Sequence, residues 1–170
     1  MVHSLTKHIG KYAFEKKTPG LTCHDGCLLP RLTNGQNSIL PAMPIIYHLV
    51  QQKLWEDALA KNQAYQPPTY EQDGFIHLSS DASFLIDIGN NFYKSVKGDY
   101  QLLCIDTDLL PAGELKFEAA APVGHMPAHS TGQSSPLFPH LYGLLLASYV
   151  IKVCAVTRGV DGEFVSIEGI

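Results

Sequence analysis

The stretch that decides the fold is residues 45–50, Ile-Ile-Tyr-His-Leu-Val, where the chain first shows a clear strand pattern. β-Branched and aromatic residues dominate this stretch, and two prolines stand just before it. The pattern therefore predicts a buried strand. Because successive side chains of a strand point to opposite faces, His48 is expected to share a face with Ile46 and Val50. Tyr47 is expected on the other face.

Downstream of this strand, the sequence alternates between helical and extended patterns. Apolar residues at helical spacing predict two helices, and β-branched runs bounded by glycine and proline predict further strands. The expected helices span 54–64 and 82–96, and the expected strands span 74–78, 100–106, 115–118, 144–146, 149–157 and 163–167. A long loop is expected at 120–139. Early helices and late strands indicate an α+β domain with a split or bent, antiparallel-rich β-sheet and two main helices.

Residues 1–44 differ from the rest of the chain in composition and charge. They contain four prolines and four glycines, and their net charge is +3, against −7 for residues 45–170. We predict a poorly ordered extension at 1–44 and a single domain at 45–170. The extension lacks the apolar core of a secretory signal, and an organellar presequence is the alternative interpretation. A soluble, cytoplasmic protein is expected, because no apolar run reaches the roughly 20 residues of a membrane-spanning helix.

The charge pattern also limits the partners. Only 16% of the residues are charged, and Arg158 is the one arginine of residues 45–170. Such a domain cannot neutralise a run of phosphates, so a nucleic-acid partner is not expected. A small anionic ligand held by backbone N–H groups is still compatible with this charge. No membrane partner is expected, and the sequence indicates no oligomeric state.

The four cysteines are too few and too scattered for a disulfide scaffold, which indicates a reducing compartment. Cys104 and Cys154 lie in apolar, strand-like runs, where a thiol acts as a small hydrophobic group. Cys23, His24 and Cys27 could ligate a metal, but no second pair follows at zinc-finger spacing. No metal site is predicted.

Two histidines in the middle of predicted strands are the main functional signal. His48 taken alone is most simply a core histidine bonded to a neighbouring carbonyl. His77 repeats the pattern within residues 73–79, Asp-Gly-Phe-Ile-His-Leu-Ser, beside the start of a predicted helix. An unpaired buried polar group costs about 1–3 kcal/mol, so two such imidazoles in one small domain are hard to explain by packing. We therefore expect them to line a common pocket.

Three further residues are candidates for the same site. His140 and Tyr142 lie in residues 138–143, Phe-Pro-His-Leu-Tyr-Gly, at the expected rim between the long loop and a strand. The structural alternative for this segment is a proline-fixed entry into the strand. Glu118 ends a predicted strand, where a carboxylate could orient a ribose hydroxyl or act as a general base.

Two polar residues near His77 have both structural and functional interpretations. Asp73 precedes a glycine and is interpreted as a turn residue. Ser79 either faces a ligand or caps the second helix, with Ser80 and Asp81 as the other capping candidates. The chain contains no glycine-rich nucleotide loop, no nucleophile elbow and no His-Glu-x-x-His zinc motif. The enzyme classes that those motifs mark therefore lose support.

Taken together, these strings resemble the domain-of-unknown-function 952 family. The resemblance covers roughly residues 45–157, and its most specific parts are the strings at 73–79 and 138–143. The family is similar in fold to the ADP-ribosyltransferase superfamily, whose split β-sheet holds NAD in a cleft. The resemblance thus implies an ADP-ribosyltransferase-like fold, NAD as a substrate, and ADP-ribosyl transfer or NAD cleavage. It also implies that His48 reaches the adenosine ribose and the nicotinamide end, with His77 beside the nicotinamide.

The resemblance assigns the remaining candidates less firmly. The third catalytic position, a glutamate in many transferases, has no secure match, and Glu118 and His140 are both candidates for it. Related RNA 2′-phosphotransferases use several arginines, so the RNA reaction is not expected here. The alternatives are a non-catalytic module for a small nucleotide-like ligand and a scaffold that engages a protein partner. The catalytic candidates are His48, His77, His140 and Glu118, and the cofactor-binding candidates are Tyr47, His48, His77, Ser79 and Tyr142.

Overall fold

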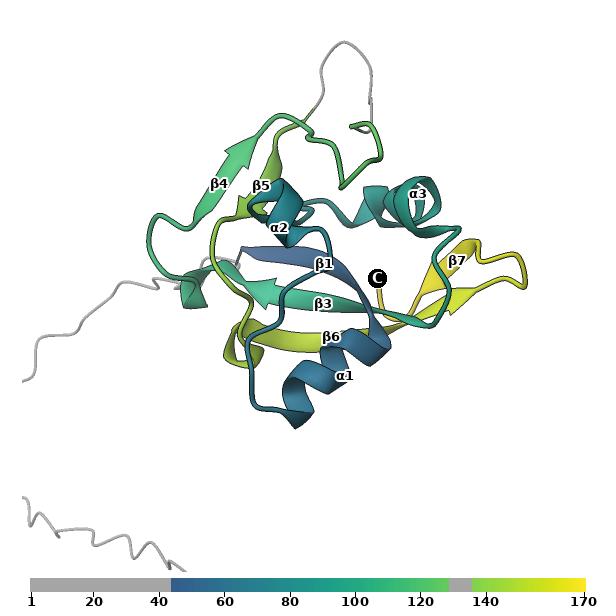
Figure 1. Cartoon of the computed structure of the whole chain (residues 1–170), viewed down its shortest axis with the longest axis horizontal. Coiled ribbons are helices and arrows are strands. Elements are labelled where there is room, and N and C mark those ends of the chain that lie inside the picture. Colours follow the sequence, from purple (N-terminus) through teal and green to yellow (C-terminus); the bar gives the residue numbers. More distant parts are fainter. Residues whose placement is uncertain (1–43, 129–135) are drawn as a thin grey trace, which may run out of the picture. The chain divides into compact units, whose positions relative to one another are not determined.

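The computed structural model of the protein describes residues 44–128 and 136–170 (Figure 1). The predicted extension, apart from Pro44, and the Cys23–Cys27 segment lie outside the described residues, as do residues 129–135 of the long loop. The described part is an α+β fold with antiparallel sheets and few helices, as the sequence pattern predicted. No described helix is both long and apolar enough to cross a bilayer.

The larger sheet has four strands in the order β1-β3-β6-β7. Its strands are β1 (Ile45–Gln51), β3 (Tyr100–Asp106), β6 (Val150–Arg158) and β7 (Phe164–Ile167). β1 and β3 pair antiparallel along their whole length, and His48 lies opposite Leu103 in the buried middle of the pair. The strand patterns predicted these four strands to within a few residues.

The smaller sheet has three strands and carries the other two histidines. Its order is β2-β5-β4, with β2 at Ile76–His77, β5 at Phe138–Leu141 and β4 at Leu115–Glu118. His77 pairs directly with His140 across β2 and β5. A two-residue bridge links the sheets, because the Tyr47 and Ser79 N–H groups each donate to the other's carbonyl, at 2.8 and 2.9 Å. This bridge brings the middle of β1, where His48 lies, next to β2.

The strand expected at 144–146 is wrong, and β5 lies earlier, at Phe138–Leu141. Within 144–146, Leu145 makes only an isolated bridge to Tyr65. Pro139 argued against a central strand, because proline has no N–H to donate. Pro139 lies just beyond the last paired residues of the short β2, so β5 tolerates the missing N–H there. The Pro139 carbonyl still accepts from the Leu78 N–H at 3.0 Å.

The helices are shorter than the sequence pattern indicates. The helix expected at 54–64 is α1, Gln52–Ala60, and an unpredicted single turn, α2, follows at Tyr70–Asp73. The segment expected as one helix at 82–96 is a 3-10 turn (η1, Ala82–Phe84), an α turn (α3, Leu85–Ile88) and a π turn (η2, Gly89–Tyr93). Two further 3-10 turns are η3 (Thr107–Leu109) and η4 (Ala147–Tyr149).

Two clusters of buried side chains cover the two faces of the larger sheet. Ile46 and Val50, which share a face with His48, pack in one cluster, and Tyr47 packs against the other, as predicted. The second cluster includes Cys104 and Cys154, both buried and both free thiols. In Figure 1, the α3 segment lies on one side of the larger sheet and α1 on the other. The two clusters therefore pack against both faces of β1, which carries His48.

Candidate functional site

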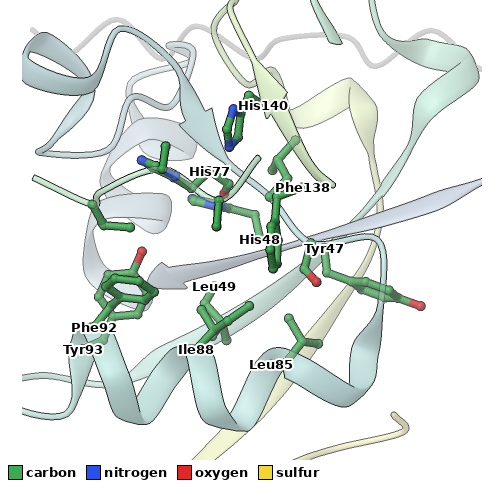
Figure 2. A pocket seen from close by; sticks show the side chains of 15 residues that line it. Tyr47, His48, Leu49, His77, Leu85, Ile88, Phe92, Tyr93, Phe138 and His140 are labelled. Atoms are coloured by element: carbon green, nitrogen blue, oxygen red, sulfur yellow. The ribbon is translucent and has the colours of Figure 1, made fainter. Parts of the chain in front are cut away.

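The structure brings the three predicted histidines, His48, His77 and His140, to one pocket (Figure 2). They come from β1, β2 and β5, so the site spans both sheets. Figure 2 shows the imidazoles on one side of the pocket and the side chains of the α3 segment on the other. The apolar part of the wall includes Leu49, Leu85, Ile88, Phe92, Val123 and Phe138.

The pocket is small and carries no formal charge on its described lining. The volume of the pocket that the centre of a water molecule can occupy is about 50 Å³. A single buried water needs about 10–15 Å³ by the same measure. No lysine, arginine, aspartate or glutamate is among the described residues that line it. The pocket therefore suits the uncharged head of a ligand better than a phosphate group.

His48 is a buried polar residue of the pocket lining that lacks a full set of hydrogen-bond partners among the described residues. Its side chain is only 4% exposed, and its Nδ1 atom lies 2.8 Å from the carbonyl oxygen of His77. A carbonyl can only accept, so Nδ1 carries the proton. Nε2 is buried and has no hydrogen-bond partner among the residues that the structure describes. In the neutral ring, Nε2 is thus a buried, unused acceptor on a residue that lines the pocket.

Burial keeps this ring neutral. Loss of hydration lowers the pKa of His48 from 6.5 to about 4, although the hydrogen bond to the His77 carbonyl opposes the shift and nearby His77 adds to it. His48 is therefore uncharged at neutral pH. An acceptor that is both neutral and buried costs free energy unless a ligand or water supplies a donor.

Asp73 orients the second histidine. The Nε2–H of His77 donates to Oδ2 of Asp73 at 3.1 Å, and the Gly124 N–H donates to both oxygens of that carboxylate, at 3.1 and 3.2 Å. The Asp73 side chain is 5% exposed. Gly74 has φ of 81°, a left-handed conformation that turns the chain from α2 into β2. This turn lets the side chains of Asp73 and His77 meet four residues apart.

His77 is also held in one tautomer. Because Nε2 carries the proton, the lone pair of the neutral ring is on Nδ1. Burial lowers the pKa of His77, the hydrogen bond and the charge of Asp73 oppose this, and His140 adds a smaller lowering. A histidine whose neutral form is favoured and whose orientation is set by a carboxylate has the properties of a general base.

His140 has its own carboxylate partner. Its Nδ1–H donates to Oε2 of Glu118 at 3.1 Å, and the hydroxyl of Tyr142 donates to the same oxygen at 2.8 Å. The His140 ring is 2% exposed and stacks on Phe75, with centroids 4.2 Å apart. The rings of His77 and His140 meet edge to face, with centroids 5.5 Å apart. Two carboxylate-held imidazoles therefore stand side by side.

Not every candidate residue reaches the pocket. Glu118 and Tyr142 lie behind His140 rather than at the described lining, and Tyr142 is 38% exposed. Tyr47 and Ser79 do line the pocket. The hydroxyl of Ser79 is engaged in a local turn, where it donates to the Asp81 carbonyl at 2.8 Å and accepts from the Asp81 N–H. Asp81 is the helix cap, accepting from the Ser83 N–H at 2.8 Å.

The sequence interpretation missed Asp73 as part of the site, because an Asp-Gly pair is typical of a turn. The signal was its spacing of four residues from His77. It also missed Phe75, whose ring packs against His77, His140 and Tyr142. The described residues contain no group of three or more His, Cys, Asp or Glu side chains arranged to hold a metal ion.

Comparison with known proteins gives a family and a fold. The family model described as "Protein of unknown function (DUF952)" matches residues 49–153. The crystal structure of protein CC0527 from Caulobacter crescentus is 26% identical, with a TM-score of 0.55, covering 71% of this chain and 93% of that one. The solution NMR structure of the same protein is 28% identical, with a TM-score of 0.50, and covers 71% and 90%. No curated protein matches the chain.

Proposed function

The chain belongs to the DUF952 family of proteins of unknown function, and we propose that it uses the histidine-lined pocket to bind a small, mainly apolar molecule. In this proposal the ligand donates a hydrogen bond to Nε2 of His48. Its apolar part packs against Leu85, Ile88 and Phe92 on the opposite wall. Burial raises the pKa of Tyr93, so its neutral hydroxyl is a further donor at the same wall.

The unpartnered Nε2 of His48 is the observation that carries this proposal. Buried polar atoms in folded proteins nearly always have a partner, because an unmade hydrogen bond costs about 1–3 kcal/mol. His48 cannot escape this cost by turning, since its Nδ1–H is held by the His77 carbonyl. A ligand hydroxyl or N–H group removes the cost, and the ring position is already fixed before binding.

A narrower form of the proposal is that the ligand is NAD or an ADP-ribose compound, with ADP-ribosyl transfer or NAD cleavage as the reaction. The resemblance to the ADP-ribosyltransferase superfamily motivates it, with His48 and His77 at the nicotinamide end. Loss of nicotinamide leaves positive charge on the ribose, which neutral imidazoles tolerate and a carboxylate stabilises. Glu118 reaches the pocket only through His140. The described lining lacks a cation for the pyrophosphate, so this part of NAD would lie outside the pocket.

Binding is tested with two probes of the same shape, phenol and its methyl ether, anisole. Phenol carries an O–H donor and anisole does not. In protein labelled with ¹⁵N-histidine, we expect phenol to shift the Nε2 resonance of His48 and to raise the melting temperature, with a smaller effect from anisole. Equal responses to both probes, or a response that persists in His48→Phe, would contradict the proposed hydrogen bond.

The narrower form is tested with NAD, ADP-ribose and nicotinamide in the same assay, together with chromatographic measurement of NAD consumption. NAD cleavage that depends on His77 would support ADP-ribosyl chemistry. A shift of the His48 resonance without turnover would support the non-catalytic binding module. Absence of both, in a folded sample that responds to phenol, would exclude NAD and leave the pocket assignment in place.

A further inference from the structure

We propose that His77 and His140 form a general acid–base pair that moves protons on the bound molecule. In this proposal, Nδ1 of His77 removes a proton and Nε2 of His140 delivers one. The reaction class is elimination or isomerisation of an uncharged, mainly apolar substrate. The inference rests on the pocket as the ligand site and adds an activity to it.

Geometry gives the first argument. The two residues are direct cross-strand partners on β2 and β5, and their ring centroids are 5.5 Å apart. Each ring has one nitrogen tied to a carboxylate, Nε2 of His77 to Asp73 and Nδ1 of His140 to Glu118. Both rings line the pocket. A small molecule in contact with both therefore meets two imidazoles whose orientations are already set.

The surroundings of the two rings differ in a way that separates their roles. Asp73 is buried and shares its charge with the Gly124 N–H, and burial of His77 outweighs the carboxylate, so its pKa is lowered. Glu118 is 41% exposed, and hydrogen bonds from Tyr142 and His140 lower its pKa and keep it ionised. Glu118 accepts the Nδ1–H of His140 and so leaves Nε2 as the ring atom available for proton transfer. This difference favours His77 as the base and His140 as the acid.

Other groups that face His77 do not compete for the base role. His48 is nearest through its bond to the His77 carbonyl, and burial holds its pKa at about 4. Tyr93 stays neutral, because burial raises its pKa. Phe75, whose ring lies 4.7 Å from that of His77, carries no titratable group. The rate of a base-catalysed reaction should therefore follow the titration of His77.

The experiment uses benzisoxazoles, small aromatic probes whose ring opening requires a base. The base takes the proton from C3, the C–H electron pair becomes the third carbon–nitrogen bond of a nitrile, and the N–O bond breaks. The N–O electron pair goes to oxygen, which takes a proton from the acid to give a cyanophenol. Proton exchange with water then resets both imidazoles for the next turnover. The 5-nitro derivative has a good leaving group and needs the base alone, whereas unsubstituted benzisoxazole also needs the acid.

We expect His77→Gln to slow ring opening of both probes by about 100-fold. His140→Gln should slow unsubstituted benzisoxazole by about 10-fold more than the 5-nitro derivative. His125→Gln is the matched control, because His125 is an exposed histidine outside the pocket and should leave both rates unchanged. In the wild type, the rate with the 5-nitro derivative should rise with pH and level off with a midpoint below the ordinary histidine value of 6.5.

Several outcomes would overturn the inference. One is a wild-type rate no higher than that of free imidazole at equal concentration, and another is a rate that His77→Gln leaves unchanged. A midpoint at or above 6.5 would exclude His77 as the base without requiring any variant to fold. The phenol and anisole comparison is read in parallel. If phenol binds through His48 and ring opening fails, the acid–base inference is wrong and the ligand site stands.

Discussion

Arg158 and His48 are two polar side chains set into the same sheet, and they differ in how fully their hydrogen bonds are made. Arg158 on β6 places its guanidinium over the rings of Tyr100 and Phe164, with distances of 5.1 and 4.8 Å to the centroids. Its three nitrogens donate to the carbonyls of Tyr93, Lys94, Val96, Gly98 and Gly162. His48 uses one nitrogen, and its other nitrogen is buried without a partner in the described part of the chain.

This difference distinguishes a structural polar group from one that is kept for a ligand. The arginine closes the C-terminal end of the η2 segment, and its donors are used by the fold itself. These donors are therefore not available to a phosphate group. The fold leaves His48 incompletely satisfied, and a neutral acceptor is what remains.

Arg158→Met should cause the largest loss of stability. Methionine fills part of the space but makes none of the hydrogen bonds to the five carbonyls. A hydrogen bond to a charged group contributes about 1.5–3 kcal/mol net of water, and such contributions do not add in full when several bonds share one guanidinium. We expect a loss of about 4 kcal/mol in the free energy of unfolding, measured by urea denaturation. Lys152→Met on the same strand is the control, since this exposed lysine donates only to the Gly169 carbonyl, at 3.2 Å. Equal effects of the two substitutions would remove the structural role of Arg158.

Acid should destabilise the protein through His48. Its pKa is about 4 in the folded protein and about 6.5 in the unfolded chain, so the unfolded chain binds the proton more readily between these values. Stability is therefore constant above pH 6.5 and is lost as the pH falls towards 4, by at most about 3 kcal/mol. The measurement is the difference in unfolding free energy between wild type and His48→Leu at each pH. A difference that does not change from pH 7 to pH 4.5 would show that His48 is not held neutral by burial.

Much of the β-structure was predictable because its signals are local. The strands at 100–106 and 115–118 coincide with β3 and β4, since β-branched and aromatic runs with clear turn residues at their ends need no distant information. The face of His48 followed from the alternation within one strand. The convergence of His48 and His77 followed from asking why two imidazoles would be buried in one small domain.

The predictions that were wrong or missing concern features that depend on contacts between residues distant in the sequence. Helix 82–96 is broken into turns of three kinds, and within it Gly89 lies so close to the Phe164 ring that a Cβ atom would approach to 2.5 Å. That contact joins residues 75 positions apart, so no local pattern contains it. Asp73 was interpreted as a turn residue because its second donor, the Gly124 N–H, is 51 residues away. β5 was also not predicted, because Pro139 is unusual in a central strand and because the pairing of β5 depends on two distant strands, β2 and β4.

Asp73→Asn tests a polar group intermediate between Arg158, whose hydrogen bonds are all made within the fold, and His48, which has one nitrogen unpaired among the described residues. The carboxylate is fully used, as Arg158 is, yet one of its partners is a pocket histidine. An amide offers one acceptor where two donors now meet, so we expect a loss of about 2 kcal/mol. The His77 ring should also lose its single tautomer, measured from ¹⁵N shifts. Asp57→Asn is the control, because Asp57 is an exposed carboxylate paired with Lys53 at 3.0 Å, and about 0.5 kcal/mol or less is expected.

His48→Leu should have the smallest effect on stability, although the side chain is among the most buried. Leucine loses the bond to the His77 carbonyl, worth about 1 kcal/mol, and also removes the unpartnered Nε2, which is unfavourable by a similar amount. At pH 8, where the ring is neutral in both states, the unfolding free energy should lie within about 1 kcal/mol of wild type, while the response to phenol disappears. A loss as large as that of Arg158→Met would mean that His48 is a structural residue after all. Stability retained together with lost binding is the result that only a ligand-facing group produces, because a packing residue cannot be removed from a core at so little cost.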